Sequence, residues 1–306
     1  MTPTVSAANT AAEQSRSPFS SVGRFFSMEN PYLAPLLITC ILLLGYFMYG
    51  FLEFPKTLLA IVTSIVTEVV LGLLILKRVP PLASAYVSGI SCGILIRSPE
   101  WWPYVLAAMI ATTSKYVIRV NNRHLWNPSN FAIVVLLIVA HNSVATLSIQ
   151  WGNDLLPMLV VWLLGSLIIA RLKRFHICAT YVGFFLVYSW IRSLITGHGF
   201  WAEVAPITGP MYQLFIFFMI TDPKTTTKQP WSQMLVAFLI ATMEFFLRLL
   251  PQYVSNPATI ILASHAPYFA LTIMGPASNL IEIIQQRKAQ RLKELQEAQS
   301  PITVTA

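Results

Sequence analysis

The sequence predicts an all-α integral membrane protein with about ten transmembrane helices. Of its 306 residues, 56% are hydrophobic and only 10% are charged. The mean hydropathy of +0.64 lies well outside the range of a soluble globular domain. Apolar runs of about 20 residues, the length that spans a bilayer core, recur along the chain. Lysines and arginines gather in alternate connections between these runs, as the positive-inside rule requires.

The apolar runs define the expected helices, some of them short. They cover residues 33–52, 57–76, 82–97, 101–119, 128–148, 155–171, 176–195, 207–221, 231–250 and 257–284. The third and the eighth are the least apolar, because serines and glycines dilute the third and Gly209-Pro210 interrupts the eighth. Short, glycine-interrupted segments of this kind line cavities in transporters.

The basic residues indicate the orientation of the chain. With the N-terminus in the cytoplasm, most of the 20 lysines and arginines fall on the inner side, and an error of one helix would destroy this pattern. The exceptions are Lys56, Arg97, Arg192 and Arg248, near outer helix ends where long side chains reach the interface. The net charge of +8 therefore reflects topology, and nucleic acid is not expected as a partner. We expect both termini in the cytoplasm.

The two ends of the chain differ from its apolar middle. Residues 1–30 are rich in Ser, Ala and Thr and predict a disordered cytoplasmic tail, ahead of a transmembrane domain at 31–285. Residues 286–306 form a charged cytoplasmic tail, which is expected to continue the last helix until Pro301 stops it. This tail is either a solvated helix or a partner-binding one. The three cysteines form no CxxC pair, so the sequence indicates neither a disulfide framework nor a metal site.

Two polar corners interrupt the apolar pattern, and we expect function there. The first is His-Leu-Trp-Asn-Pro-Ser-Asn-Phe at 124–131, in which Asn127 and Pro128 suit the start of a helix. The second is Thr-Asp-Pro-Lys-Thr-Thr-Thr-Lys-Gln-Pro at 221–230. Both corners are expected on the cytoplasmic side. Asn127 and Asp222 are therefore predicted to meet near a cavity that the Ser- and Gly-rich third segment leaves open.

Charged groups within the apolar runs need partners. Burying Glu68 costs on the order of a few kcal/mol unless it is paired or protonated. Glu68 is therefore an ion-coupling group, an acceptor for a cofactor edge, or a carboxyl bonded to a neighbouring helix. Lys115 and Arg119 share a helix face and approach the first corner. There they either form an anion site or are the basic residues that ordinarily flank the cytoplasmic end of a membrane helix. Glu244 and Arg248 have the i, i+4 spacing of a structural ion pair.

With their surroundings, these corners resemble the NqrB/RnfD family, which supplies membrane subunits to the sodium-pumping NADH:quinone reductase and to the Rnf electron-transport complex. The resembling residues cover about 55–285 and lie, in order, at 87–95, 100–103, 115–128, 207–210, 217–223 and 256–258. The resemblance implies a bundle of ten helices in two related halves. It also implies a multi-pass protein of the bacterial cytoplasmic (inner) membrane.

The family carries flavin, either as noncovalent riboflavin or as FMN esterified to a threonine in a Ser-Gly-Ala-Thr type motif. Here the nearest match is Ser143-Val144-Ala145-Thr146, which lacks the glycine and lies in a short loop. A noncovalent flavin is therefore expected, with covalent FMN on Thr146 as the alternative. Shortened relatives occur as stand-alone proteins, including enediyne biosynthesis proteins, which argues against membership in a complete multi-subunit pump.

The leading hypothesis is a membrane electron-transport subunit that binds riboflavin or FMN noncovalently and passes electrons to a partner subunit or a quinone. The residues expected to contact the flavin are Ser88, Gly89, Lys115, Arg119, Asn127, Pro128, Thr146, Thr208, Gly209 and Asp222. Glu68 is expected to couple an ion. The alternative is a permease for a small organic solute or cofactor on the same scaffold, with Glu68 as its coupling acid.

Overall fold

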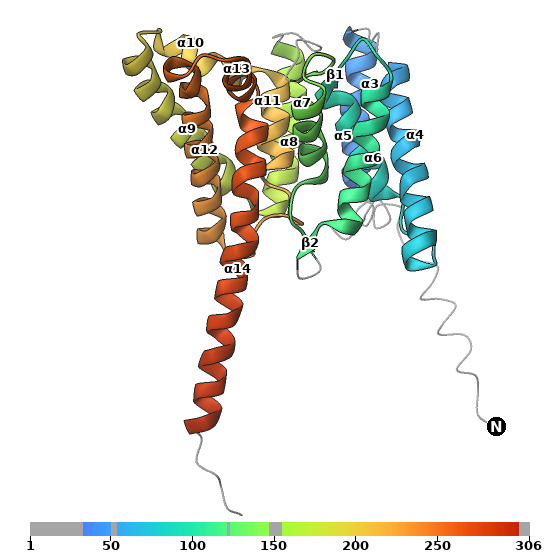
Figure 1. The fold of residues 1–306 in the computed structure, drawn as a ribbon, viewed down its shortest axis with the longest axis vertical. Coiled ribbons are helices and arrows are strands. Elements are labelled where there is room, and N and C mark those ends of the chain that lie inside the picture. The colour runs from blue at the N-terminus through green and yellow to red at the C-terminus, as the bar shows by residue number, and fades with distance from the viewer. Residues whose placement is uncertain (1–32, 50–53, 121–122, 147–154, 300–306) are drawn as a thin grey trace, which may run out of the picture.

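Helices make up nearly all of the regular structure in this chain. The computed structural model describes residues 33–49, 54–120, 123–146 and 155–299, and the expected all-α class is confirmed for these residues. Among the described residues, the first five helices are α3 (Leu33–Tyr49), α4 (Phe54–Leu71) with its π-helical continuation η1 (Gly72–Leu76), α5 (Ala83–Leu95), α6 (Trp102–Val117) and α7 (Pro128–Val139). They lie beside one another on one side of the bundle (Figure 1).

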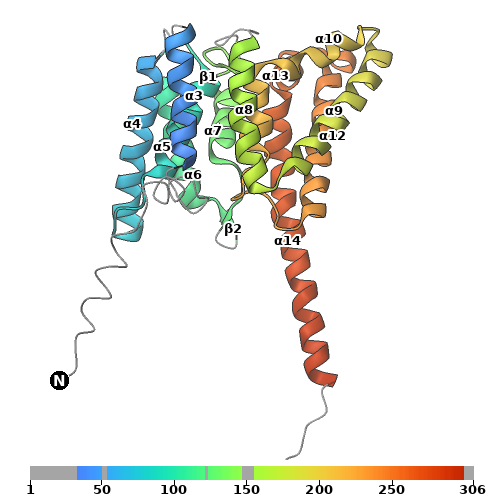
Figure 2. The same ribbon diagram turned by 180° about the vertical axis from the view of Figure 1, so that it is seen from behind.

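The second group of helices lies on the other side. It contains α8 (Leu155–Leu172), α9 (Phe175–Thr196), α10 (Phe200–Val204), η3 (Ala205–Thr208), α11 (Pro210–Leu214), η4 (Phe215–Met219), α12 (Pro230–Tyr253), α13 (Pro257–Ser264) and α14 (Ala266–Gln299). Helix α12 packs against α9 and α14, while α4 packs against α5 and α6. The two groups meet where α7 contacts α14 and where α3 contacts α8, as the view from behind shows (Figure 2).

Four two-residue strands form two short antiparallel ladders. Strand β1 (Ile96–Arg97) pairs with β4 (Ala145–Thr146), and β2 (Arg119–Val120) pairs with β3 (Arg123–His124). The two ladders lie at opposite ends of the bundle (Figure 1). They therefore mark two faces, and β2–β3 belongs to the face that carries the first polar corner.

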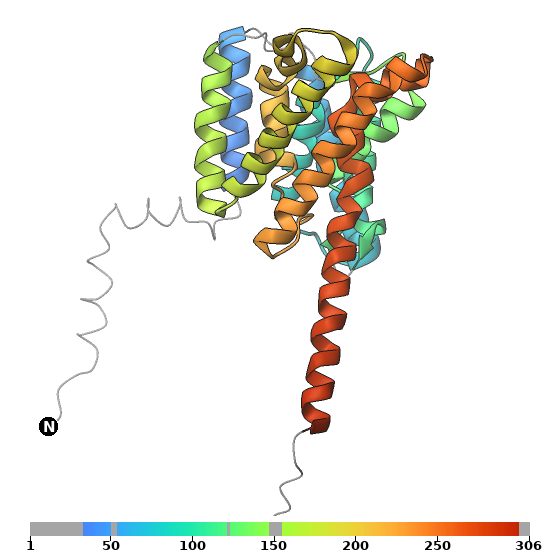
Figure 3. The same ribbon diagram turned by 90° about the vertical axis from the view of Figure 1, so that its left-hand side faces the viewer.

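By length and composition, three described helices suit a membrane span: Phe54–Leu76, Phe175–Thr196 and Pro230–Tyr253. A fourth is obtained if α13 and α14 count together as one bent span. Helix α14 also runs far out of the bundle on the β2–β3 face (Figures 1 and 3). The expected helical continuation of the last segment is thus confirmed as far as Gln299.

Three expected spans differ from the observed helices. The segment predicted at 128–148 is a helix only to Val139, about 18 Å at 1.5 Å per residue, because polar residues follow and β4 then pairs with β1. The segment at 207–221 divides at Gly209 into η3, α11 and η4. The segment at 257–284 bends by 82° between α13 and α14. Pro267 lies just after this bend and lacks the N–H that would continue the helix.

Candidate functional site at the two polar corners

The first corner begins α7 as the sequence predicts. The Asn127 side chain accepts a hydrogen bond from the backbone N–H of Asn130 at 3.2 Å, and Pro128 occupies the first turn of the helix. This cap satisfies one of the free N–H groups at the helix start. The nitrogen of the same Asn127 amide donates a hydrogen bond to the second corner.

The acceptor at the second corner is the Asp222 carboxylate. Asn127 Nδ2 donates to Asp222 Oδ2 at 3.2 Å, across 95 positions in the sequence. The other carboxylate oxygen, Oδ1, accepts from the backbone N–H of Lys224 at 2.9 Å. Arg174 reinforces the turn by donating through Nη1 to the Thr221 carbonyl and the Thr226 hydroxyl, each at 3.1 Å. The predicted meeting of the two corners is confirmed.

Behind this contact lies a small, mostly apolar cavity of about 20 Å³, room for about one water molecule. Its lining comprises Leu125, Trp126, Asn127, Met219, Ile220, Thr225, Thr226, Val236, Ile240, Leu271 and Gly275. The Trp126 ring stacks on Phe131 with centroids 4.9 Å apart, and its Nε1 donates to the Thr272 carbonyl at 2.7 Å. A rigid aromatic face thus borders the corner.

Asn130, in the first turn of α7, carries an unused acceptor. Its Nδ2 donates to the Tyr268 carbonyl at 3.1 Å and to the Thr272 hydroxyl at 2.7 Å. Its buried Oδ1 accepts no hydrogen bond within the described chain. A buried acceptor without a donor costs free energy, so this oxygen is a position where a ligand N–H would be stabilising.

Two titratable groups at the corners have perturbed pKa values. Burial raises the pKa of Asp222 above its ordinary value, although the Lys224 backbone N–H, the charges of Lys224 and Arg174 and the Asn127 amide act to lower it. Burial also lowers the pKa of His124 to about 4, helped by the positive charges of Arg119, Lys224 and Lys115. His124 is therefore neutral near pH 7 and lies in a positive field.

Lys115 points away from the corner and into the first group of helices. Its Nζ lies 3.5 Å from Glu68 Oε2 and donates to the Ser84 carbonyl at 3.0 Å. Tyr116 donates to Glu68 Oε1 at 2.8 Å. Lys115 is thus paired with Glu68, and Glu68 has the helix-to-helix partners that its burial demands. Arg119, by contrast, stays at the corner on β2.

Contrary to expectation, the cavity beside the corners is not lined by Ser88 and Gly89, which are buried on α5. The Ser88 hydroxyl donates to the Ser84 carbonyl at 3.0 Å. A Cβ built on Gly89 would lie 2.6 Å from the Ile61 Cα, and one on Gly93 would lie 2.8 Å from the Thr57 Cα. The small residues therefore let α5 approach the α4 backbone closely, as Gly-xxx-Gly patterns do between membrane helices.

Thr146 lies on β4, which pairs with β1, and Thr208 ends η3, which follows α10 and precedes Gly209. Strand β1 and helix α10 lie at the end of the bundle opposite to β2 (Figure 1). The Thr208 hydroxyl donates to the Ala205 carbonyl at 2.7 Å, and the Gly209 N–H donates to the Pro206 carbonyl at 3.3 Å. Thr146 is buried, and its hydroxyl is hydrogen-bonded to His265 Nδ1. The residues expected to share one flavin site thus belong to two faces of the bundle.

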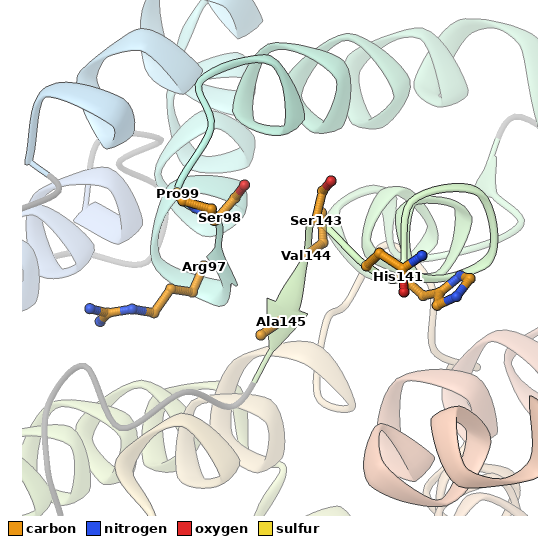
Figure 4. A pocket seen from close by; sticks show the side chains of 8 residues that line it. Arg97, Ser98, Pro99, His141, Ser143, Val144 and Ala145 are labelled. Carbon is orange, nitrogen blue, oxygen red and sulfur yellow. The ribbon is translucent and has the colours of Figure 1, made fainter. Parts of the chain in front are cut away.

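The opposite face carries a larger, open cleft of about 420 Å³ between β1 and the loop before β4 (Figure 4). Ser98 and Ser143 lie on opposite sides of it, while the Arg97 and His141 side chains point away (Figure 4). Ala145 lines the cleft, whereas the next residue, Thr146, bonds to His265. Because strand side chains alternate, Thr146 is turned away from this cleft.

The second group of helices contains a buried carboxylate network that the sequence reveals only in part. The predicted pair of Glu244 and Arg248 is confirmed, with Arg248 Nε 2.8 Å from Glu244 Oε1. Tyr181 and Tyr212 also donate to this carboxylate, and these contacts between helices have no signal in the sequence.

Three further residues at the corner, His124, Trp126 and Asn130, were not among the expected contacts of the ligand. Each presents a group that a ligand could use: an imidazole nitrogen, an aromatic face and an amide oxygen. Their position within three residues of Asn127 is the signal in the sequence that could have identified them.

No protein-family model matches the chain, and the search of curated proteins found no match.

Proposed function

We propose that this protein is a membrane electron-transport subunit, similar to the NqrB/RnfD family of the sodium-pumping NADH:quinone reductase and the Rnf complex. It holds a flavin noncovalently at the two polar corners and passes electrons to a partner subunit or a quinone. The observation that carries this proposal is the hydrogen bond from Asn127 to Asp222. It joins the two motifs on which the resemblance most depends, and it does so beside an aromatic, mostly apolar cavity.

The donors and acceptors at the corner suit a flavin. The pyrimidine ring of a flavin has an N–H donor between two carbonyl acceptors. The Asp222 carboxylate is an acceptor for such an N–H, and the Asn127 amide is a donor for a carbonyl. The Trp126 ring offers a flat face for stacking. When bound, the flavin supplies one- and two-electron chemistry, and the chain supplies position and electrostatics.

The cavity of about 20 Å³ is far smaller than a flavin ring system. The cavity in this structure therefore does not admit the ring system, and the proposal rests on the hydrogen bond between the corners and on the resemblance.

The proposed protein has ten spans in two related halves, in a bacterial inner membrane with both termini in the cytoplasm. Helix starts support the two halves. Asn127-Pro128 begins α7 and Asn256-Pro257 begins α13, and in each case the Asn side chain accepts from the backbone N–H three residues later. The two starts lie at opposite faces, as an inverted repeat of five helices requires (Figure 1).

A permease is the second candidate, and the broken helices favour it. Helices α13 and α14 bend by 82°, and η4 continues α11 as a π-helix. Discontinuous helices commonly form the substrate sites of transporters. In this function Glu68 would couple ion movement to transport, with Lys115 occupying the cation position in the absence of the ion.

The visible absorption spectrum of the purified full-length protein separates the two functions. We expect a flavin band at about 450 nm. Release of the flavin on denaturation, without the need for proteolysis, would establish noncovalent binding. A protein that stays colourless after incubation with riboflavin and with FMN, but accumulates a solute in proteoliposomes, would contradict electron transport and favour the permease.

A further inference from the structure

We propose that Gly275-Pro276 in α14 is a hinge, which Trp126 locks by donating a hydrogen bond to Thr272. The hinge joins the first polar corner to the projecting part of α14, residues 286–299. Movement at the corner then changes the direction in which this part of the helix points. The inference rests on contacts within the chain, so it holds for either candidate function and does not require a bound flavin.

Pro276 leaves one backbone carbonyl of α14 without its helical donor. It lies inside the helix, where a proline ring has no N–H to donate and crowds the carbonyl four residues earlier. That carbonyl belongs to Thr272. The preceding Gly275 adds backbone freedom, because it has no side chain to restrict its conformation. Helices bend at proline and glycine, so this pair is the point at which α14 bends most readily.

Trp126 supplies the missing donor from outside the helix. Its Nε1 donates to the Thr272 carbonyl at 2.7 Å, across 146 positions in the sequence. The indole is itself held by stacking on Phe131, with an angle of 14° between the rings. A Cβ built on Gly275 would lie 3.8 Å from Trp126 Cδ1, so the ring also lies against the hinge. One side chain therefore satisfies the freed carbonyl and packs on the bending point.

The two sides of the hinge are held differently. On the upper side, the Asn130 amide of α7 donates to the Thr272 hydroxyl at 2.7 Å. On the lower side, the Gln285 amide donates to the Ser232 hydroxyl of α12 at 2.9 Å. Residues 286–296 are then exposed, and the helix leaves the bundle (Figures 1 and 3). The upper part is thus fixed to the bundle, and the lower part is a lever.

The lock is part of the first corner. Trp126 directly precedes Asn127, whose Nδ2 donates to Asp222 Oδ2 at 3.2 Å. Trp126, Asn127 and Gly275 line the same cavity of about 20 Å³, together with Thr225 of the second corner. A shift of the corner therefore moves the indole away from the Thr272 carbonyl. This chain of direct contacts gives the coupling a physical route.

Distances between spin labels test the hinge in the full-length protein in nanodiscs. Labels are placed at Arg78→Cys and Gln290→Cys, two exposed positions, after replacement of Cys40 by Ser. Position 290 lies about 21 Å along the helix from Pro276, at 1.5 Å per residue. A change of about 20° in the bend therefore moves this label by about 7 Å.

Three substitutions separate the hydrogen bond from the packing. Trp126→Phe keeps an aromatic ring but removes the N–H, whereas Pro276→Ala restores a helical N–H for the Thr272 carbonyl. Trp231→Phe removes the N–H of an exposed indole on α12 and is the matched control.

We expect one narrow distance distribution in the wild type and in Trp231→Phe. Trp126→Phe should shift or broaden it by about 7 Å, but should have no effect in a Pro276→Ala background, because the alanine supplies the donor. An unchanged distribution in Trp126→Phe would overturn the lock. So would a change that persists in the Pro276→Ala background, since the indole would then act through packing alone.

Asp222→Ala tests the coupling to the corner, because it removes the partner of Asn127 without touching α14. It should move the distribution in the same direction as Trp126→Phe, and an unchanged distribution would overturn the coupling. Thermal unfolding gives a second readout if Trp126→Phe is too unstable to label. Its loss of thermal stability should be smaller in the Pro276→Ala background, and equal losses in both backgrounds would overturn the inference. These outcomes leave the visible absorption of the wild type, and with it the proposed function, unaffected.

Discussion

Asn127 makes hydrogen bonds in two directions, and its two roles can be separated by experiment. Its oxygen caps α7, and its nitrogen bonds to Asp222. Asn256 caps α13 in the same way but is exposed at the other face, which makes it a matched control. Asn127→Ala and Asn256→Ala should each lower the free energy of unfolding by about 1 kcal/mol, the cost of a lost cap. Only Asn127→Ala should lower the flavin content of the purified protein.

Asp222 completes a double-mutant cycle with Asn127. Because the two side chains are bonded and belong to one proposed site, the effects of Asn127→Ala and Asp222→Ala on flavin occupancy should be non-additive. The coupling free energy should fall at about 0.5–3 kcal/mol. Occupancy is measured by absorption in the two single variants, the double variant and the wild type. Strictly additive losses would mean that the corners act as separate turns.

Glu68 is paired with a lysine at a depth where neither charge is well hydrated. Side chains of Glu68 and Lys115 are only 8% and 4% exposed. Glu68→Gln should therefore leave an unpaired buried ammonium and cost about 3–5 kcal/mol, and the double variant Glu68→Gln/Lys115→Met should recover much of this loss. Thermal unfolding of the wild type, the single variant and the double variant checks this order of stabilities. Glu294→Gln, at an exposed position, is the control. A stable Glu68→Gln variant that has lost activity would instead support the coupling role.

His124 makes stability depend on pH. Its pKa in the folded protein is lowered to about 4 from an ordinary value of 6.5. Between these values the unfolded chain binds more protons than the folded one, so this contribution to stability is full above pH 6.5 and is lost as the pH falls toward 4. The wild type should lose more thermal stability than His124→Gln between pH 7 and about pH 5. Parallel melting curves for the two proteins would show that His124 is solvated as in the unfolded chain.

Some of these residues were predictable and others were not. Asn127 and Pro128 indicate a helix start because capping depends on local sequence, and the meeting with Asp222 follows from placing both corners on one face. The partnership of Glu68 with Lys115 depends on how α4 and α6 are rotated about their axes, which a list of apolar runs does not contain. The tyrosines on Glu244 were missed for the same reason.

At the scale of elements, glycine patterns have two meanings that sequence alone does not separate. Gly89 and Gly93 suggested an open cavity, but they allow close packing of α5 on α4. Helix breaks were easier to predict where Gly or Pro marks them, as at Gly209-Pro210. The early end of α7 was harder, because it depends on the pairing of β4 with a strand that lies far away in the sequence.

The close approach of α4 and α5 predicts opposite effects for two Gly→Ala substitutions. In Gly89→Ala the new Cβ would lie 2.6 Å from the Ile61 Cα, so the helices must separate and the protein should be destabilised. In Gly183→Ala, on α9, the Cβ meets no atom within 4 Å. Alanine should stabilise that helix by up to about 1 kcal/mol. Thermal unfolding in detergent checks both, and equal effects would mean that α5 does not pack closely on α4.

At the scale of the whole molecule, the structure separates two faces. The β2–β3 ladder, both polar corners and the projecting part of α14 lie on one face, and α10 and β1 lie on the other (Figure 1). The projecting part of α14 carries Arg287, Lys288, Arg291 and Lys293. Lys224 and Lys228 are on the same face as these cations, and from this shared charge the positive-inside rule predicts the cytoplasmic side for the corners.

Labelling of single cysteines in intact cells checks this sidedness. Native Cys40 is exposed and is replaced by Ser, whereas Cys92 and Cys178 are buried. We expect Lys228→Cys and Gln290→Cys to react with a membrane-impermeant maleimide only after permeabilisation, because both exposed positions lie on the basic face. Thr208→Cys, exposed on the opposite face, should react in intact cells. Reaction of Lys228→Cys from outside would reverse the orientation, and with it the side from which an electron donor reaches the corner. Reaction of Lys228→Cys and Thr208→Cys from the same side would contradict a bundle that spans the membrane.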